Sequence, residues 1–146
     1  MRIIADLHIH SKYSRATSST MDLEILSKWA KWKGITVIGT GDFTHPLWFQ
    51  ELQQKLKPAA EGLYQFDDVY YMLTVELNHL FYVDGKAKTI HNLVFVPTLE
   101  VAERLNKELS RYGDLMSDGR PLIRLEAKKL VEIALAIDPG CMIVPA

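Results

Sequence analysis

The chain has 146 residues, of which 48% are apolar and 24% are charged, a composition typical of one globular domain rather than of a disordered chain. Its 17 Lys and Arg residues against 18 Asp and Glu residues leave a formal charge of −1, which excludes a strongly basic nucleic-acid-binding coat but not a local basic patch. The single cysteine excludes an internal disulfide framework and a cysteine-rich zinc finger. Neither an apolar stretch of about 18 residues nor a signal peptide is found, so we expect a cytoplasmic protein without membrane contact.

The first part of the chain alternates between short apolar runs and amphipathic segments. These patterns predict a strand at 3–5, a polar loop at 11–19, a helix at 20–33, a buried strand at 35–39 and a helix from 46 to about 57. Ser19 or Thr20 is the expected N-cap of the first helix, and Gly34 its end. Pro58 is expected to end the second helix.

The second part begins with two long β-type runs, at 70–82 and 86–96, which an Asp84-Gly85 turn joins into a hairpin. Helices are predicted from about 98 to 112 and from 125 to 138, with a surface loop at 111–124 and a final strand at 141–146. The whole pattern predicts an α/β fold on a mainly parallel sheet or barrel. A complete βα barrel needs about 250 residues, whereas a doubly wound sheet could close at this length. The chain is therefore either a small sheet or the front portion of a larger fold, and the site residues described below favour the second.

The sharpest motif is Asp6-Leu7-His8-Ile9-His10, at the end of the first predicted strand. In a strand, alternate side chains share a face, so we expect Asp6, His8 and His10 to point together. Two imidazoles on one face are a suitable start for a metal site. The alternatives are two ordinary surface histidines, or one histidine packed in the core.

The second predicted strand ends in Gly-Thr-Gly-Asp42-Phe-Thr-His45, which would deliver a carboxylate and another imidazole to the same sheet edge. The alternative is a turn-forming aspartate and a helix-start histidine.

The hairpin adds two more candidate ligands, Glu76 and His91. A carboxylate in an otherwise apolar strand needs a partner, and a metal would serve, while His91 lies on the returning strand of the same hairpin. An outward-facing glutamate and a hydrogen-bonded strand histidine are the alternatives, and His79 is expected to be structural or to contact substrate. Imidazoles with carboxylates suit Zn, Mn or Fe better than Ca or Mg. Ligands from several strands indicate more than one ion.

Four segments together, DLHIHSKYS, GTGDFTHP, TVELN and IHNLVF, resemble the polymerase and histidinol phosphatase (PHP) family of metallophosphoesterases. The forms of GTGDFTHP and HNLVF are most similar to the archaeal and bacterial branch that contains endonuclease Q, which nicks DNA beside deaminated or damaged bases. The resemblance implies a distorted (β/α)7, TIM-like barrel, here its front portion with a β-hairpin insertion. It also implies two or three metal ions at the C-terminal edge.

By position, His8 and His10 resemble ligands of the first metal, and Glu76 resembles the carboxylate that bridges the first and second metals. His91 resembles a ligand of the second metal, and His45 a ligand of the third.

Asp6 and Asp42 resemble carboxylates that orient imidazoles, and Glu76 and Asp42 are the residues that we expect to be catalytic. Lys12 and Arg15, in the loop after the first strand, are expected to bind phosphate oxygens of DNA, with a solvated basic loop as the alternative.

The family carries further ligands beyond a segment like IVPA, so residues 1–146 are expected to form a single, partial PHP domain. The implied function is that of a metal-dependent phosphoesterase domain in a DNA-repair endonuclease. A small-molecule phosphatase of the histidinol-phosphate kind and a non-catalytic metal-binding fragment are the alternatives. We expect this chain alone to be inactive, and to form homo-oligomers through apolar edges at 141–146 and 125–138.

Overall fold

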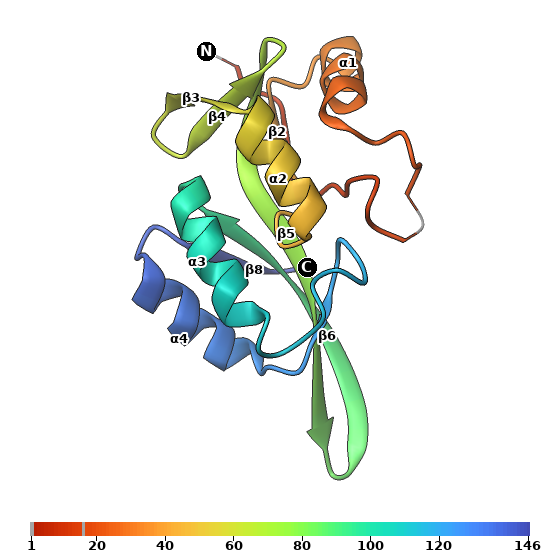
Figure 1. Cartoon of the computed structure of the whole chain (residues 1–146), viewed down its shortest axis with the longest axis vertical. Coiled ribbons are helices and arrows are strands. Elements are labelled where there is room, and N and C mark those ends of the chain that lie inside the picture. Colours follow the sequence, from red (N-terminus) through yellow and green to blue (C-terminus); the bar gives the residue numbers. More distant parts are fainter. Residues whose placement is uncertain (1, 16) are drawn as a thin grey trace.

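The structure, a computed structural model, describes residues 2–15 and 17–146, which form a mixed α/β fold as the sequence predicted (Figure 1). Within these residues there are four helices: α1 Leu23–Lys33, α2 Pro46–Lys55, α3 Leu99–Leu109 and α4 Ala127–Ile137. The strands of the first half are β1 Ala5–Asp6, β2 Val37–Gly39, β3 Lys57–Ala60 and β4 Leu63–Phe66. Those of the second half are β5 Val69–Val83, β6 Lys86–Val96, β7 Leu122–Ile123 and β8 Met142–Pro145.

Strand β5 is the axis of the sheet, because its two ends pair with different neighbours. Residues 70–72 pair with β2 in parallel, 69–71 pair with β4, 73–83 pair with β6, and 78–79 pair with β7 in parallel. Strand β1 continues the sheet beyond β2, and β8 pairs antiparallel with β6. The prediction of a mainly parallel sheet is wrong, since tight turns join β3 to β4 and β5 to β6, and a tight turn gives antiparallel neighbours.

Several element boundaries differ from the prediction. Helix α1 begins at Leu23 because Asp22, rather than Ser19 or Thr20, is its N-cap and accepts a hydrogen bond from the amide of Ile25 at 2.9 Å. Helix α2 ends at Lys55, ahead of Pro58. The residues that follow form the β3–β4 hairpin, which the sequence analysis missed because it shows no regular alternation of apolar residues.

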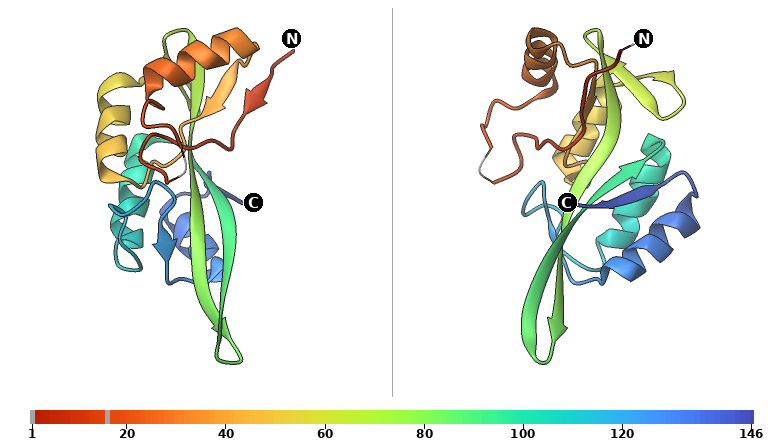
Figure 2. Two further views of the ribbon diagram at one scale, coloured as in Figure 1. Left: turned by 90° about the vertical axis from the view of Figure 1, so that its right-hand side faces the viewer. Right: turned by 180° about the vertical axis from the view of Figure 1, so that it is seen from behind.

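The core is one cluster of buried residues to which all four helices contribute, and α3 and α4, which lie side by side, pack against β5 and β6 (Figures 1 and 2). Alternation along β5 directs Leu73, Val75 and Leu77 to this helix-covered face, and all three are fully buried. The intervening Thr74, Glu76 and Asn78 therefore point to the opposite face. This alternation places Glu76 on the face where a site can form.

Beyond the core, the β5–β6 hairpin extends past the helices as a two-stranded arm (Figure 2). Its turn at Asp84-Gly85 confirms the predicted hairpin, with φ values of 49° and 74°. The expected apolar edges are observed, since Val131, Leu135, Met142 and Val144 are exposed. Among the described helices, none is both long and apolar enough to cross a membrane.

Candidate metal centre

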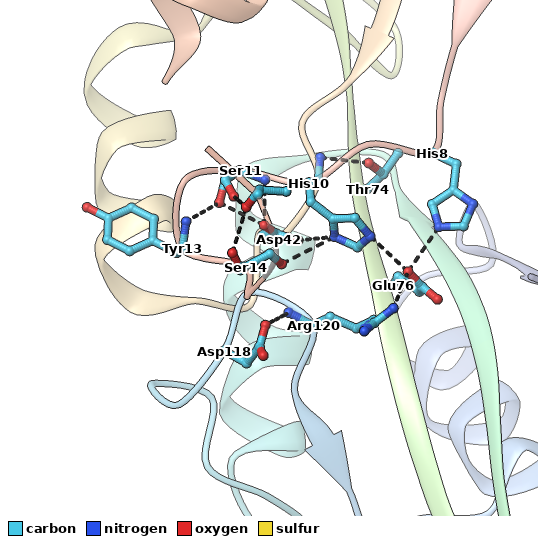
Figure 3. A network of polar contacts seen from close by, with 12 residues as sticks. His8, His10, Ser11, Tyr13, Ser14, Asp42, Thr74, Glu76, Asp118 and Arg120 are labelled. Atoms are coloured by element: carbon cyan, nitrogen blue, oxygen red, sulfur yellow. Dashed lines mark hydrogen bonds and ion pairs between the residues drawn. The ribbon is translucent and has the colours of Figure 1, made fainter. Parts of the chain in front are cut away.

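Glu76 lies in the middle of β5 and is only 4% exposed, yet three imidazoles contact its carboxylate. Its Oε2 lies 3.0 Å from Nε2 of His8 and 2.9 Å from Nε2 of His10. Its Oε1 lies 2.6 Å from Nδ1 of His91. Figure 3 shows His8 and His10 approaching Glu76 from the same stretch of chain. Residues separated by up to 83 positions in sequence thus form one polar cluster, which we call the Glu76 cluster.

Sheet pairing explains why these residues meet. Strands β1, β2 and β5 are parallel neighbours, so the chain that leaves β1 passes over the middle of β5, where Glu76 lies. His91 is paired with Asn78 in β6, which puts its side chain on the same face as Glu76. The alternatives of an outward-facing glutamate and of isolated surface histidines do not describe this arrangement.

Two glycines let the segment after β1 approach β2 closely. A Cβ atom at Gly39 would lie 2.6 Å from the carbonyl oxygen of Leu7, and one at Gly41 would lie 2.4 Å from that of Ile9. Gly41 also has a φ of 60°, which favours glycine. The Gly-Thr-Gly sequence therefore serves to bring His8 and His10 down onto the sheet.

Asp42 is fully buried beside the Glu76 cluster and contacts the other nitrogen of His10. Its Oδ1 lies 3.0 Å from Nδ1 of His10, and its Oδ2 accepts hydrogen bonds from the amide and the hydroxyl of Ser11 at 2.6 and 2.7 Å. The hydrogen bond to Asp42 raises the pKa of His10 despite its burial. Because Nδ1 is held as a donor, Nε2 is the nitrogen that faces Glu76 and could bind a metal.

The donor atoms of the Glu76 cluster suit a divalent cation. One ligand atom each from His8, His10 and Glu76 lie within 4.8 Å of one another. Donors about 2.0–2.1 Å from a shared tetrahedral ion are roughly 3.3 Å apart, close to the observed separations. Burial would raise the pKa of Glu76, but the hydrogen bond from His8 and the charges of Arg120 and His10 lower it, which keeps the carboxylate ionised. Imidazole and carboxylate donors fit Zn, Mn or Fe.

His45 lies outside this group of donors. It is 4% exposed at the N-cap position of α2, and its ring stacks on that of Tyr13 with centroids 4.3 Å apart. Its Nε2 donates to the carbonyl oxygen of Met116 at 3.2 Å, while its buried Nδ1 has no partner among the described residues. This geometry agrees with the helix-start alternative, and a role as ligand of a third metal stays a prediction.

Asp6 is exposed at the end of β1 and borders an apolar cavity of about 320 Å³ beside α1. Over residues 2–15 and 17–146 it makes no hydrogen bond to an imidazole. The structure therefore does not bring Asp6 together with His8 and His10, because the regular strand ends at Asp6 and strict alternation ends with it.

The two cations of the loop after β1 pair with carboxylates outside the Glu76 cluster. The ammonium of Lys12 lies 2.9 Å from Oε2 of Glu51, and Nε of Arg15 lies 3.5 Å from Oδ2 of Asp118.

His79 is buried on the helix-covered face, where its Nδ1 donates to the carbonyl oxygen of Leu125 at 2.8 Å. That contact agrees with the structural alternative for His79.

The segment at 111–124 was predicted to be a surface loop, but the structure places part of it beside the Glu76 cluster. It contains β7, and Nη1 of Arg120 lies 3.7 Å from Oε2 of Glu76 (Figure 3). The sequence offered one signal: Asp118-Gly119 is a turn dipeptide directly before Arg-Pro and the apolar pair of β7. The pattern marks a turn, but only the pairing of β7 with β5 shows where that turn lies.

No protein-family model matches the chain. An uncharacterized protein of Methanocaldococcus jannaschii is 34% identical over 142 residues, which are 97% of this chain and 16% of that protein.

Two solved structures are similar over nearly the whole chain. The crystal structure of the lesion-specific endonuclease PfuEndoQ from Pyrococcus furiosus has a TM-score of 0.86 and 33% identity, over 100% of this chain and 34% of that one. Endonuclease Q in complex with a 27-mer duplex with an abasic lesion at the active site has a TM-score of 0.84 and 33% identity, over 98% of this chain and 34% of that one. The chain has the fold of that third of endonuclease Q. It spans about a third of the length of those structures and about a sixth of the curated relative.

Proposed function

We propose that this chain carries part of the metal centre of a PHP-type phosphoesterase, and that it belongs to a lesion-specific DNA endonuclease. The observation that carries the proposal is the convergence of His8, His10 and His91 on the two oxygens of buried Glu76. The similarity to endonuclease Q, which includes a complex with duplex DNA, supports DNA as the partner.

The two oxygens of Glu76 have different neighbours, which supports a bridging role. Oε2 faces His8 and His10, whereas Oε1 faces His91. We infer that Glu76 would hold ions together with His8 and His10 on one side and with His91 on the other. His45 is proposed for a third position, and Asp42 as the residue that orients His10.

Divalent ions bound there would supply Lewis acidity at the phosphate and a water of lowered pKa. The hydrolysis would form a bond from the water oxygen to phosphorus and break the ester P–O bond, while the water gives up a proton and the leaving oxygen takes one up. Glu76 and the imidazoles would hold the ions, and Asp42 keeps the Nδ1 proton of His10 in place. Lys12 and Arg15 are proposed to contact DNA phosphates at the edge of this surface.

Metal content is the first test. The purified chain, treated with a chelator and then loaded with Zn²⁺ or Mn²⁺, should retain at least one ion per chain, and His8→Ala should retain less. We expect the chain alone not to nick DNA, because the described residues bring only four donor side chains to a centre for two or more ions. Specific nicking by the chain that His8→Ala abolishes would contradict that expectation.

Nuclease function is tested in a chimera in which this chain replaces the matching third of the Pyrococcus furiosus enzyme. A chimera that melts cooperatively and holds metal should nick a duplex with one abasic site, leave the undamaged duplex intact, and lose activity in His8→Ala. A folded, metal-loaded chimera that hydrolyses only small phosphate monoesters would favour the small-molecule phosphatase. Metal binding without either activity would favour a non-catalytic domain.

A further inference from the structure

Arg120 is the cationic side chain that faces the Glu76 cluster. Its Nη1 lies 3.7 Å from Oε2 of Glu76, which is longer than a hydrogen bond, so the two groups attract each other without sharing a proton. Across residues 2–15 and 17–146, the guanidinium donates no hydrogen bond. The side chain is 40% exposed at the edge of the cluster. The guanidinium is therefore accessible to an anion that enters from solvent beside the cluster.

The backbone on both sides of Arg120 is fixed by hydrogen bonds. The amide of Gly119 donates to the carbonyl oxygen of Tyr13 at 3.0 Å, and the amide of Arg120 donates to Oδ1 of Asp118 at 3.0 Å. The carbonyl oxygen of Pro121 accepts a hydrogen bond from the amide of Asn78 at 3.1 Å, two residues along β5 from Glu76. The arginine is thus held between the loop after β1 and the strand that bears Glu76.

Gly119 fits closely against the groups that orient His10. A Cβ atom at Gly119 would lie 2.3 Å from Oδ2 of Asp42 and 2.6 Å from Oγ of Ser14. Only a glycine allows the chain to pass this close to Asp42. The turn that carries Arg120 therefore packs directly against the carboxylate that orients His10.

The neighbouring cations are less suited to hold an anion at Glu76. Lys12 is paired with Glu51 and lies over the rings of Tyr13 and Trp48, and Arg15 is 82% exposed. Arg120 combines a fixed backbone, a planar fork of donors and direct proximity to the cluster.

We propose that Arg120 is a catalytic residue that donates hydrogen bonds from its guanidinium to the nonbridging oxygens of the phosphodiester that is cleaved. This role rests on the proposed function. A phosphodiester carries one negative charge over two nonbridging oxygens, and a guanidinium matches such a pair of acceptors with two parallel N–H groups. As the phosphate enters, the ion pair between Arg120 and Glu76 gives way to hydrogen bonds with the substrate.

The test compares Arg120→Ala, Arg120→Lys and the control Arg124→Ala, which removes the same charge from an exposed side chain on the same segment. Fluorescence anisotropy measures binding of a duplex with one abasic site at several salt concentrations, with EDTA or with Mn²⁺. Arg120→Ala should weaken binding roughly 10-fold. Arg120→Lys should recover part of the loss, and Arg124→Ala should stay within about 2-fold of the parent.

Calorimetric titration with Mn²⁺ separates this role from a merely structural one. Arg120→Ala should bind the metal as tightly as the parent or more tightly, whereas loss of a merely structural residue would weaken metal binding too.

The outcomes separate the two proposals. If the parent binds metal and DNA but Arg120→Ala behaves like Arg124→Ala, the role of Arg120 is overturned and the metal centre stands. If DNA binding depends on Arg120 although the parent binds no metal, Arg120 is supported and the metal centre fails. If the parent does not bind the duplex with EDTA or with Mn²⁺, the proposed role of Arg120 is overturned.

Discussion

Two buried carboxylates, Asp42 and Glu76, share His10 but are satisfied in different ways. Asp42 accepts from the amide and hydroxyl of Ser11, groups that keep their protons at any ordinary pH. Glu76 is surrounded by imidazoles and a guanidinium instead. Besides His10, the donors of Asp42 can form only hydrogen bonds, whereas the imidazoles around Glu76 can also bind a metal.

Asp42 thus has a structural role in the site, whereas Glu76 is a candidate ligand of the metal. Asp42 has a φ of 52°, a conformation that aspartate tolerates better than most residues, and its oxygens hold the segments around His10 and Ser11. Removing it should cost stability. Removing the charge of Glu76 should cost metal affinity instead, and both expectations can be measured.

The largest expected effect is that of Asp42→Ala. The substitution leaves the Ser11 amide, the Ser11 hydroxyl and the His10 imidazole without their acceptor in a buried site, so we expect a loss of about 3–5 kcal/mol in the free energy of unfolding. Urea denaturation in the presence of EDTA measures it. Asp114→Ala is the control, because that exposed carboxylate accepts one amide hydrogen bond from Met116. Equal losses in the two variants would refute the structural role of Asp42.

The second effect concerns Glu76→Gln, which keeps the shape of the side chain but removes its charge. We expect the affinity for Zn²⁺ or Mn²⁺ to fall roughly 100-fold. Mutating a residue that only supports a ligand typically lowers metal affinity about 10–100-fold, and weakening a ligand itself should cost at least the upper end of that range. Isothermal titration calorimetry gives the affinity, and Glu51→Gln, in the carboxylate that pairs with Lys12, serves as the control. Unchanged affinity in Glu76→Gln would remove Glu76 from the metal centre.

A smaller effect is expected for Asp22→Ala, a carboxylate that accepts a single amide hydrogen bond at the start of α1. Loss of an N-cap costs about 1 kcal/mol, well below the effect expected for Asp42. Glu126 is a matched control, because it occupies the N-cap position of α4 without a capping hydrogen bond. Thermal unfolding should therefore separate Asp22→Ala from Glu126→Ala, and coincident melting curves would contradict the capping role.

The smallest expected effect is the pH dependence of stability that His79 contributes, which differs in sign from that of His10. His10 lies between carboxylates, whereas His79 is buried with Nε2 unpartnered among the described residues, and this burial lowers the pKa of His79. The pKa of histidine in an unfolded chain is about 6.5. Just below that pH, the His79 side chain binds a proton in the unfolded chain but not in the folded chain. The contribution of His79 to stability is therefore complete above about pH 6.5 and falls as the pH decreases.

The difference in unfolding free energy between the parent and His79→Gln, followed from about pH 5 to pH 7 in EDTA, isolates this contribution. His10, whose pKa is raised, contributes in the opposite sense: its share is present at low pH and is lost as the pH rises through its folded pKa. Parallel curves for parent and variant would show that His79 does not titrate as its burial predicts.

Local sequence rules predicted the elements whose signals are local. Asp84-Gly85 specified the β5–β6 turn, and Gly34 ended α1. The β3–β4 hairpin was missed because its apolar pattern is weak, and Asp22 was overlooked as a cap in favour of two hydroxyl side chains.

The candidate site was predictable where motif and strand coincide, as at His8, His10 and Glu76. Arg120 was missed because its place depends on β7, a pair of residues whose pairing with Asn78 and His79 is a long-range event. Asp6 was expected to act with the histidines, but the strand ends there. Sequence patterns thus identified residues able to do chemistry, and tertiary pairing decided which of them meet.

Strand β5 has a further consequence for amide hydrogen exchange. Its central residues have neighbours on both sides and a helix-covered core beneath them, so their amides should exchange most slowly and only through global unfolding. The segment from His8 to Arg15 lies outside the regular strands and should exchange through local opening. The Glu76 cluster therefore joins a strand that opens only with the whole fold to a segment that can open locally. A bound ion would slow exchange in the histidine segment and leave that of β5 nearly unchanged.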